Sequence, residues 1–151
     1  GATNVYRIAG PGPAGLTLLG DALKGWAPVT LAQYLDVSPA TQAAVALAAI
    51  AGHMLPAFSR FRGGKGVATT LGTGLALAAG TILAMALIWL LVFRQWRIAS
   101  LASIIAAGSG PIIAFLLNPP HTGLFLIIAL VLFVRHRDNL VRLAQGSEHH
   151  L

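Results

Sequence analysis

Apolar residues run in long stretches along the chain, separated by short segments that contain charged residues, glycine or proline. Such stretches predict membrane-spanning helices, and the segments between them mark the helix ends. These segments are Asp36-Val-Ser-Pro, the basic segment Ser59–Gly66, Gly80, Arg94–Ile98 and Asn118-Pro-Pro-His. The predicted spans are Ala14–Leu35, Pro39–Ala57, Val67–Ala79, Thr81–Phe93, Ala99–Leu117 and Thr122–Val134.

The number of crossings depends on the stretch from Val67 to Phe93. A helix of about 13 residues rises only about 20 Å against a hydrocarbon core of about 30 Å, so this stretch also fits one long tilted span. Charge favours two spans, because nine of the ten Lys and Arg residues then lie on one side. Basic residues gather in cytoplasmic loops. We therefore expect an all-α polytopic transmembrane helix bundle of about six short spans with both termini cytoplasmic.

Composition excludes a soluble globular enzyme. Of the 151 residues, 56% are hydrophobic and 9% are charged, whereas a soluble domain is about 25% charged. The net charge of +6 would suggest nucleic-acid binding in a soluble protein, but in a membrane protein it is typical of cytoplasmic loops. We therefore expect membrane lipid around the chain and no nucleic-acid partner.

The segment Gly63-Gly-Lys-Gly66 is the most informative candidate site. Its three glycines surround Lys65 just before an apolar helix, so that backbone N–H groups, a helix N-terminus and an ammonium group converge. We expect this segment to bind an anion. Gly66 stands where a nucleotide-binding P-loop needs Ser or Thr for magnesium, so that motif is excluded. The alternative is a basic loop that contacts phospholipid headgroups.

Two further candidates lie nearer the N-terminus. Thr3, Asn4 and Arg7 belong to a polar N-terminal loop that suits phosphate recognition, unless the terminus is frayed. Asp21 and Lys24 lie three residues apart in an apolar span, where helical spacing lets them neutralise each other. They mark either a functional site or a structural ion pair. Because Gly25 and Pro28 follow, we expect this helix to be locally irregular and to line a cavity.

Polar residues recur in the C-terminal half at helical spacing. Arg97, Ser100 and Ser103 share one face, where the hydroxyls either donate to an anion or bond back to helix carbonyls. A polar amphipathic tail follows the last span, and such a tail is more often a solvated face than a site. Its residues of interest are His136, Asn139, Arg142 and Glu148.

Several motifs of other enzymes are missing from the sequence. No His is followed by Asp five positions later, so the His-x4-Asp dyad that one class of acyltransferases uses is absent. The chain has no Gly-x-Ser-x-Gly elbow, and four acidic residues are too few for a carboxylate-rich metal site. Cysteine is absent, which excludes thioester chemistry on the protein. We expect no metal and no cofactor.

Six segments in order resemble the membrane-integral bacterial glycerol-3-phosphate acyltransferases, the PlsY family. They are Gly1-Ala-Thr-Asn-Val-x-Arg7, Leu16-Thr-Leu-Leu-Gly-Asp21-Ala-Leu-Lys24-Gly25, Gly52-His53-x-x-Pro56, Phe61-Arg-Gly-Gly-Lys-Gly-Val-Ala-Thr69, Ser100-Leu-Ala-Ser103-Ile and Arg135-His-Arg-Asp-Asn-Leu-Val-Arg-Leu-Ala-x-Gly-x-Glu148. The resemblance implies a bacterial inner-membrane enzyme whose active site faces the cytoplasm. It implies transfer of an acyl group from acyl phosphate to glycerol 3-phosphate, giving lysophosphatidic acid in phospholipid synthesis.

The resemblance also implies roles for individual residues. The acceptor and the acyl-phosphate group would be held by Lys65, Gly63, Gly64 and Gly66, with His53 nearby. The phosphate cradle would be completed by Arg7, Thr3, Asn4, Ser100 and Ser103, and Arg97 is a further substrate-binding candidate. The glycerol hydroxyls would be oriented by Asn139, His136 and Glu148. The proton acceptor is His53, His136 or a substrate phosphate oxygen.

The family normally has a further N-terminal span and a Gly-Ser-Gly-Asn-x segment directly before Gly-Ala-Thr-Asn. Neither is present here, so residues 1–151 are expected to form a single integral-membrane acyltransferase domain, N-terminally truncated, of a family with seven spans.

Two other classes of function compete with an acyltransferase. A transporter or channel for a phosphorylated anion would use the basic segments as an entry funnel, and it predicts polar residues that continue to the far side. The far halves of the predicted spans are rich in Leu, Ala and Ile, which favours a pocket open on one face. A small structural subunit would not need glycines and basic residues to converge.

Overall fold

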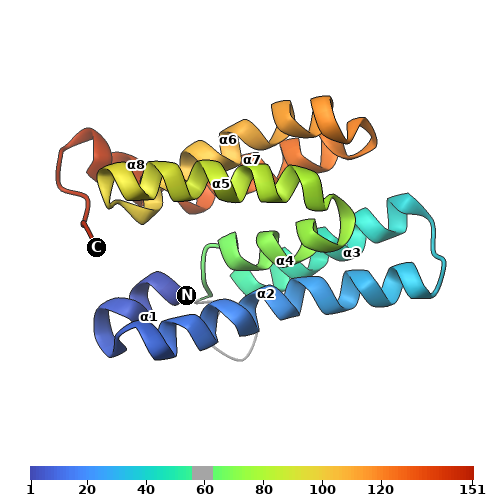
Figure 1. The fold of residues 1–151 in the computed structure, drawn as a ribbon, viewed down its shortest axis with the longest axis horizontal. Helices are drawn as coiled ribbons and strands as arrows, with labels where there is room; N and C mark the ends of the chain where they lie inside the picture. The colour runs from blue at the N-terminus through green and yellow to red at the C-terminus, as the bar shows by residue number, and fades with distance from the viewer. Residues whose placement is uncertain (56–62) are drawn as a thin grey trace. The chain divides into compact units, whose positions relative to one another are not determined.

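The computed structural model describes residues 1–55 and 63–151. Part of the predicted basic segment and of the resemblance therefore lies outside the described residues, namely Pro56, Arg60, Phe61 and Arg62, together with the end of the second predicted span. The described residues form helices and no strand, as expected for an all-α protein. The chain divides into two compact units, Gly1–Ala79 and Gly80–Leu151, coloured blue to green and green to red in Figure 1.

The described residues of unit 1 form the helices α1 (Ala2–Ala9), α2 (Pro11–Tyr34), α3 (Pro39–Met54) and α4 (Val67–Leu77). Gly10 has φ +82°, and this left-handed conformation separates α1 from α2 at a position where glycine is not strained. Ser38 caps α3, since its Oγ accepts a hydrogen bond from the Thr41 N–H at 3.2 Å. The predicted break at Asp36-Val-Ser-Pro is therefore confirmed.

The prediction of an N-terminal loop is wrong. Residues 2–9 form α1, which packs against α2 (Figure 1). Polar residues of this segment alternate with apolar ones at helical spacing, and Val5 is half-buried while Thr3, Asn4 and Arg7 are exposed. The polar composition of this segment concealed an amphipathic helix, of which Ala2 and Val5 are half-buried and Tyr6 and Ile8 are exposed.

The predicted irregularity at Gly25 and Pro28 is also absent, because α2 is helical without a break from Pro11 to Tyr34. Gly25 serves close packing instead. A Cβ at this position would meet the carbonyl oxygen of Thr69 and lie 3.0 Å from Thr73 N, both on α4. Gly72 of α4 faces the backbone of Ala22 and Trp26 in the same way. Small residues at both positions let the two helix backbones touch, as in membrane helix pairs.

Unit 2 continues with α5 (Ala79–Trp96), α6 (Ala99–Leu117), the 3-10 turn η2 (Pro119–His121), α7 (Thr122–Arg135) and α8 (Arg137–Ala144). The predicted break at Gly80 is displaced, because the chain turns at Ala78, with φ −152° and ψ 62°. Gly80 lies in the first turn of α5, where backbone N–H groups need no partner within the helix. The separation of this region into two helices is confirmed.

Among the described residues, α5 and α6 are each long and apolar enough to cross a membrane, and α4 and η2–α7 are shorter apolar helices. One face of α5 is buried through Ile82, Met85 and Val92. The opposite face exposes the leucines Leu83, Leu87, Leu90 and Leu91. An exposed face made of leucine is suited to hydrocarbon and not to water. The number of six spans remains a prediction.

Candidate functional site

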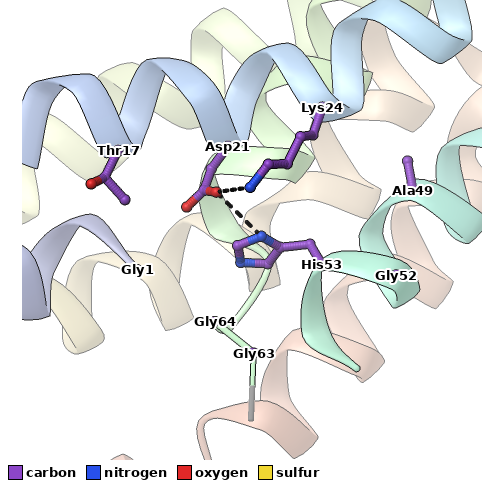
Figure 2. A pocket seen from close by; sticks show the side chains of 9 residues that line it. All are labelled: Gly1, Thr17, Asp21, Lys24, Ala49, Gly52, His53, Gly63 and Gly64. Carbon is purple, nitrogen blue, oxygen red and sulfur yellow. Dashed lines mark hydrogen bonds and ion pairs between the residues drawn. The ribbon is translucent and has the colours of Figure 1, made fainter. Parts of the chain in front are cut away.

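Unit 1 contains a pocket of about 480 Å³ between α2, α3 and the start of the chain after residue 62. Figure 2 shows the residues that line it: Gly1, Thr17, Asp21, Lys24, Ala49, Gly52, His53, Gly63 and Gly64. The volume lies within the range of small-molecule sites. Charged side chains of α2 thus face a glycine backbone across a cavity.

Asp21 is the centre of the charges in this pocket. Its Oδ1 lies 3.0 Å from Lys24 Nζ and 3.5 Å from His53 Nδ1, so one carboxylate oxygen faces both nitrogens (Figure 2). Asp21 is only 6% exposed, whereas the Lys24 side chain is 65% exposed. The predicted Asp21–Lys24 pair is confirmed, and the expectation that this helix lines a cavity is confirmed with it.

The glycine segment supplies backbone to the pocket. Gly63 and Gly64 line it, and a Cβ at Gly64 would meet Nε2 of His53 and lie 3.0 Å from its Cε1. Gly66 has φ +85° and is the N-cap of α4, a conformation that favours glycine. Lys65 lies between them with an exposed side chain. The structure therefore places Gly64 against His53, whereas Gly66 faces Met54 and Ile50.

The N-terminal candidates reach the pocket only through Gly1. Thr3, Asn4 and Arg7 are exposed on α1, and none of them is among the described lining residues. Thr17 does line the pocket, although its hydroxyl donates to the Pro13 carbonyl at 2.9 Å. The sequence did not predict Thr17 as a site residue, because a single hydroxyl in an apolar helix does not indicate whether it faces a cavity.

Unit 2 places the two serines at the beginning of α6. Ser103 Oγ donates to the Ala99 carbonyl at 2.8 Å and accepts from Trp89 Nε1 at 3.0 Å, so the back-bonding alternative holds for this residue. Ser100 differs. Its hydroxyl is buried and has no hydrogen-bond partner among the described residues, which leaves its donor available.

Arg97 stands just before α6 with φ +57°. Its guanidinium lies 5.5 Å from the centre of the Phe93 ring, and its Nε donates to the Leu151 carbonyl at 3.2 Å. These contacts hold Arg97 at the junction between α5 and α6.

One face of the polar tail is buried, although Arg137 and Asp138 are exposed. His136, Asn139 and Glu148 are 2%, 4% and 9% exposed. Asn139 Nδ2 donates to Glu148 Oε1 at 3.0 Å, and Arg142 Nε donates to Glu148 Oε2 at 2.9 Å. His136 Nδ1 donates to the Leu132 carbonyl at 2.8 Å, so the Nδ1 proton is committed to the backbone. Helical spacing predicted that these residues share a face, but their burial depends on the return of the chain after Gly146.

Burial raises the pKa of Glu148, but the hydrogen bonds from Asn139 and Arg142 and the charge of Arg142 outweigh burial, and the pKa lies below its ordinary value of 4.5. The ionised Glu148 carboxylate therefore stabilises the fold fully above pH 4.5. This stabilisation is lost as the pH falls through the lower pKa that Glu148 has in the folded state.

We expect Glu148→Gln to lower the stability at neutral pH and to reduce the loss of stability on acidification, measured by thermal unfolding in detergent. Asp138→Asn is the matched control. The Asp138 side chain is 76% exposed, and its ion pair with Arg137 is solvated and contributes little to stability. An equal acid response in the Glu148 variant and the unmodified chain would contradict this expectation.

Within the described residues, no three His, Cys, Asp or Glu side chains lie together in a way that could hold a metal ion. The groups that the structure offers are instead ammonium, guanidinium, amide and hydroxyl donors. Such donors suit phosphate oxygens.

The chain is similar to known proteins over nearly its whole length. Residues 1–146 match the sequence model of the family described as glycerol-3-phosphate acyltransferase. A glycerol-3-phosphate acyltransferase of Hahella chejuensis is 56% identical over 151 residues, which are 100% of this chain and 78% of the relative. One of Halorhodospira halophila is 47% identical over 98% of this chain and 76% of the relative.

Two solved structures resemble the fold. Both are of PlsY, described as an integral membrane glycerol 3-phosphate acyltransferase. The glycerol 3-phosphate form has a TM-score of 0.94 and 37% identity, covering 100% of this chain and 77% of that chain. The lysophosphatidic acid form has a TM-score of 0.93 and 36% identity, covering 100% of this chain and 79% of that chain.

Proposed function

The chain belongs to the glycerol-3-phosphate acyltransferase family, and we propose that it takes its acyl group from an acyl phosphate. The family settles the class of function: the protein is an integral membrane enzyme that transfers an acyl group to glycerol 3-phosphate. The transporter and structural-subunit interpretations are therefore set aside. The donor, the residues and the membrane face make up the proposal.

The chemistry of an acyl phosphate matches the side chains of this protein. An acyl phosphate is a mixed anhydride with phosphate as its leaving group, so a hydroxyl of glycerol 3-phosphate can attack the carbonyl carbon directly. The new C–O bond forms, the bond from the acyl carbon to the phosphate oxygen breaks, and the hydroxyl proton leaves with a base or a phosphate oxygen. The chain contains no cysteine, and this route needs none. Its main demand is a preorganised set of donors for phosphate.

The observation that carries the proposal is the glycine backbone at the wall of the pocket in unit 1. Gly63 and Gly64 face a cavity that Lys24 and His53 also line. Lys65 and Gly66 follow at the start of α4, where the helix dipole favours an anion. We assign phosphate binding to Gly63, Gly64, Lys65 and Gly66, with His53 beside them. Thr3, Asn4 and Arg7 on α1 are assigned to the same phosphate-binding role.

Residues of unit 2 are assigned to the same reaction on chemical grounds. The buried Ser100 hydroxyl is available as a donor to phosphate, and Arg97 supplies a guanidinium. Asn139 and His136 are assigned to the glycerol hydroxyls, and Glu148 holds Asn139 in place at 3.0 Å. Ser103 donates its own proton to the Ala99 carbonyl and accepts a hydrogen bond from Trp89. We therefore assign it a supporting role.

We assign the enzyme to the bacterial inner membrane, with its active site on the cytoplasmic face and residues 1–151 as one acyltransferase domain. The support is the charge pattern, in which nine of ten Lys and Arg residues fall on one side of a six-span topology. Glycerol 3-phosphate and the phosphate of the donor are water-soluble groups that would enter from that side.

The test is a comparison of donors. We expect the purified protein in lipid to form lysophosphatidic acid from palmitoyl phosphate and glycerol 3-phosphate, and not from palmitoyl coenzyme A. Lysophosphatidic acid and inorganic phosphate are measured together and should appear in equal amounts. Product formed from the thioester alone would overturn the proposed donor.

A further inference from the structure

Asp21 and His53 form a carboxylate–imidazole pair between residues that are far apart in the sequence. Asp21 lies in the middle of α2 and His53 near the end of α3, and Asp21 Oδ1 is 3.5 Å from His53 Nδ1. Both side chains are nearly buried, with 9% of Asp21 and 10% of His53 exposed. Figure 2 shows the two side chains pointing toward each other across the pocket.

The opposite edge of the imidazole faces the glycine segment. A Cβ added to Gly64 would meet Nε2 and would lie 3.0 Å from Cε1 and 3.4 Å from Cδ2. The ring therefore stands between a carboxylate at Nδ1 and the Gly64 backbone at Nε2. Any rotation of the ring would change the space in which Gly64 lies.

A carboxylate accepts hydrogen bonds and donates none, so it favours the imidazole tautomer with a proton on Nδ1. The nitrogen that then lacks a proton is Nε2, which faces Gly64. Functional histidines are often oriented in this way, by a carboxylate that accepts a hydrogen bond from the ring nitrogen not used in function.

We propose that Asp21 is a positioning residue for the acyl transfer: it fixes the orientation and tautomer of His53, and His53 in turn holds Gly63 and Gly64 in the shape that binds glycerol 3-phosphate. This inference rests on the phosphate-binding role assigned to the glycine segment above. Asp21 is assigned no contact with the substrate, because its Oδ1 faces Lys24 Nζ and His53 Nδ1.

Neutralising Lys24 is the competing explanation for Asp21. The Lys24 side chain is 65% exposed, so water and lipid headgroups can solvate its charge without a buried carboxylate. Asp21 is the buried member of the pair, and a buried carboxylate requires partners. His53 is the partner that connects it to the glycine segment.

A kinetic double-mutant cycle tests the proposal. We expect Asp21→Asn, which keeps the size of the side chain, to raise KM for glycerol 3-phosphate by about tenfold or more and to change kcat by less than about threefold. Asp36→Asn is the matched control, because Asp36 is exposed at the other end of α2 with φ 51°, a conformation that Asn adopts readily. This control should keep both constants at the values of the unmodified chain.

The cycle with His53→Asn shows whether Asp21 acts through His53. We expect the double variant to have the same KM for glycerol 3-phosphate as His53→Asn alone, since both changes remove the same Asp21–His53 interaction. Independent losses that multiply would overturn the proposal, and so would an unchanged KM in Asp21→Asn. Recovery of KM when Lys24→Gln is added to Asp21→Asn would show that Asp21 only neutralises Lys24, and would overturn it too.

A spectroscopic measurement separates this inference from the proposed function. In nitrogen-15 spectra of the unmodified protein, with His53 assigned by comparison with His53→Asn, we expect a protonated Nδ1 and an unprotonated Nε2. The opposite tautomer would overturn the positioning role, even if Asp21→Asn failed to fold. A chain that shows the expected tautomer but forms no lysophosphatidic acid from palmitoyl phosphate would instead overturn the proposed donor.

Discussion

We expect Lys65→Ala to abolish acyl transfer and to leave the fold intact. Lys65 lies between Gly64 and Gly66, just before α4, and its ammonium group is assigned to the phosphate of the substrates. Removing a positioned charge from a transition state costs several kcal/mol, about 3 kcal/mol or a loss of roughly a hundredfold or more in kcat/KM. The side chain is exposed, so stability should change by less than about 0.5 kcal/mol. Initial rates of lysophosphatidic acid formation and thermal unfolding measure the two effects.

Arg137→Ala is the matched control for Lys65. Its side chain is 79% exposed and pairs with an exposed Asp138 at 3.4 Å, so it removes a cation without touching an assigned site. We expect its rate to stay within about twofold of the unmodified protein. Near-normal turnover of Lys65→Ala, or an equal loss in both variants, would contradict the assignment of Lys65 to the phosphate.

We expect Gly64→Ala to raise KM for glycerol 3-phosphate without changing the net charge. The added methyl group would meet His53 Nε2 and lie 3.0 Å from Cε1, so either the imidazole or the glycine backbone must move. We expect kcat/KM to fall by about tenfold to a hundredfold, which corresponds to about 1.4–2.7 kcal/mol. Kinetics at varied glycerol 3-phosphate concentration measure the change.

Gly15→Ala provides the comparison for Gly64. Gly15 lies in α2 with no atom within 4 Å of an added Cβ, and alanine is the better helix former. This variant should keep the activity of the unmodified protein. If Gly64→Ala behaves in the same way while charge-changing variants of Lys65 lose activity, the segment only contacts lipid headgroups, and the backbone role is wrong.

Helix ends were predictable where local chemistry decides them. The break before Pro39 follows from the serine cap at Ser38 and from proline. The sequence-based prediction of helix boundaries was wrong at two places. Residues 2–9 form a helix that packs against α2, and the turn lies at Ala78 and not at Gly80.

The sequence by itself determined that the chain is an all-α membrane protein, because 56% hydrophobic residues and 9% charged ones leave no water-facing surface for a soluble domain. It also determined that glycines and a lysine converge before a helix, because these residues are adjacent in the chain. Only the tertiary structure decided that Asp21 faces His53, and that Asn139 and Arg142 enclose Glu148. The physical reason is that hydrophobicity and turn chemistry act between neighbours along the chain, whereas these pairs depend on how helices and the returning C-terminal segment pack.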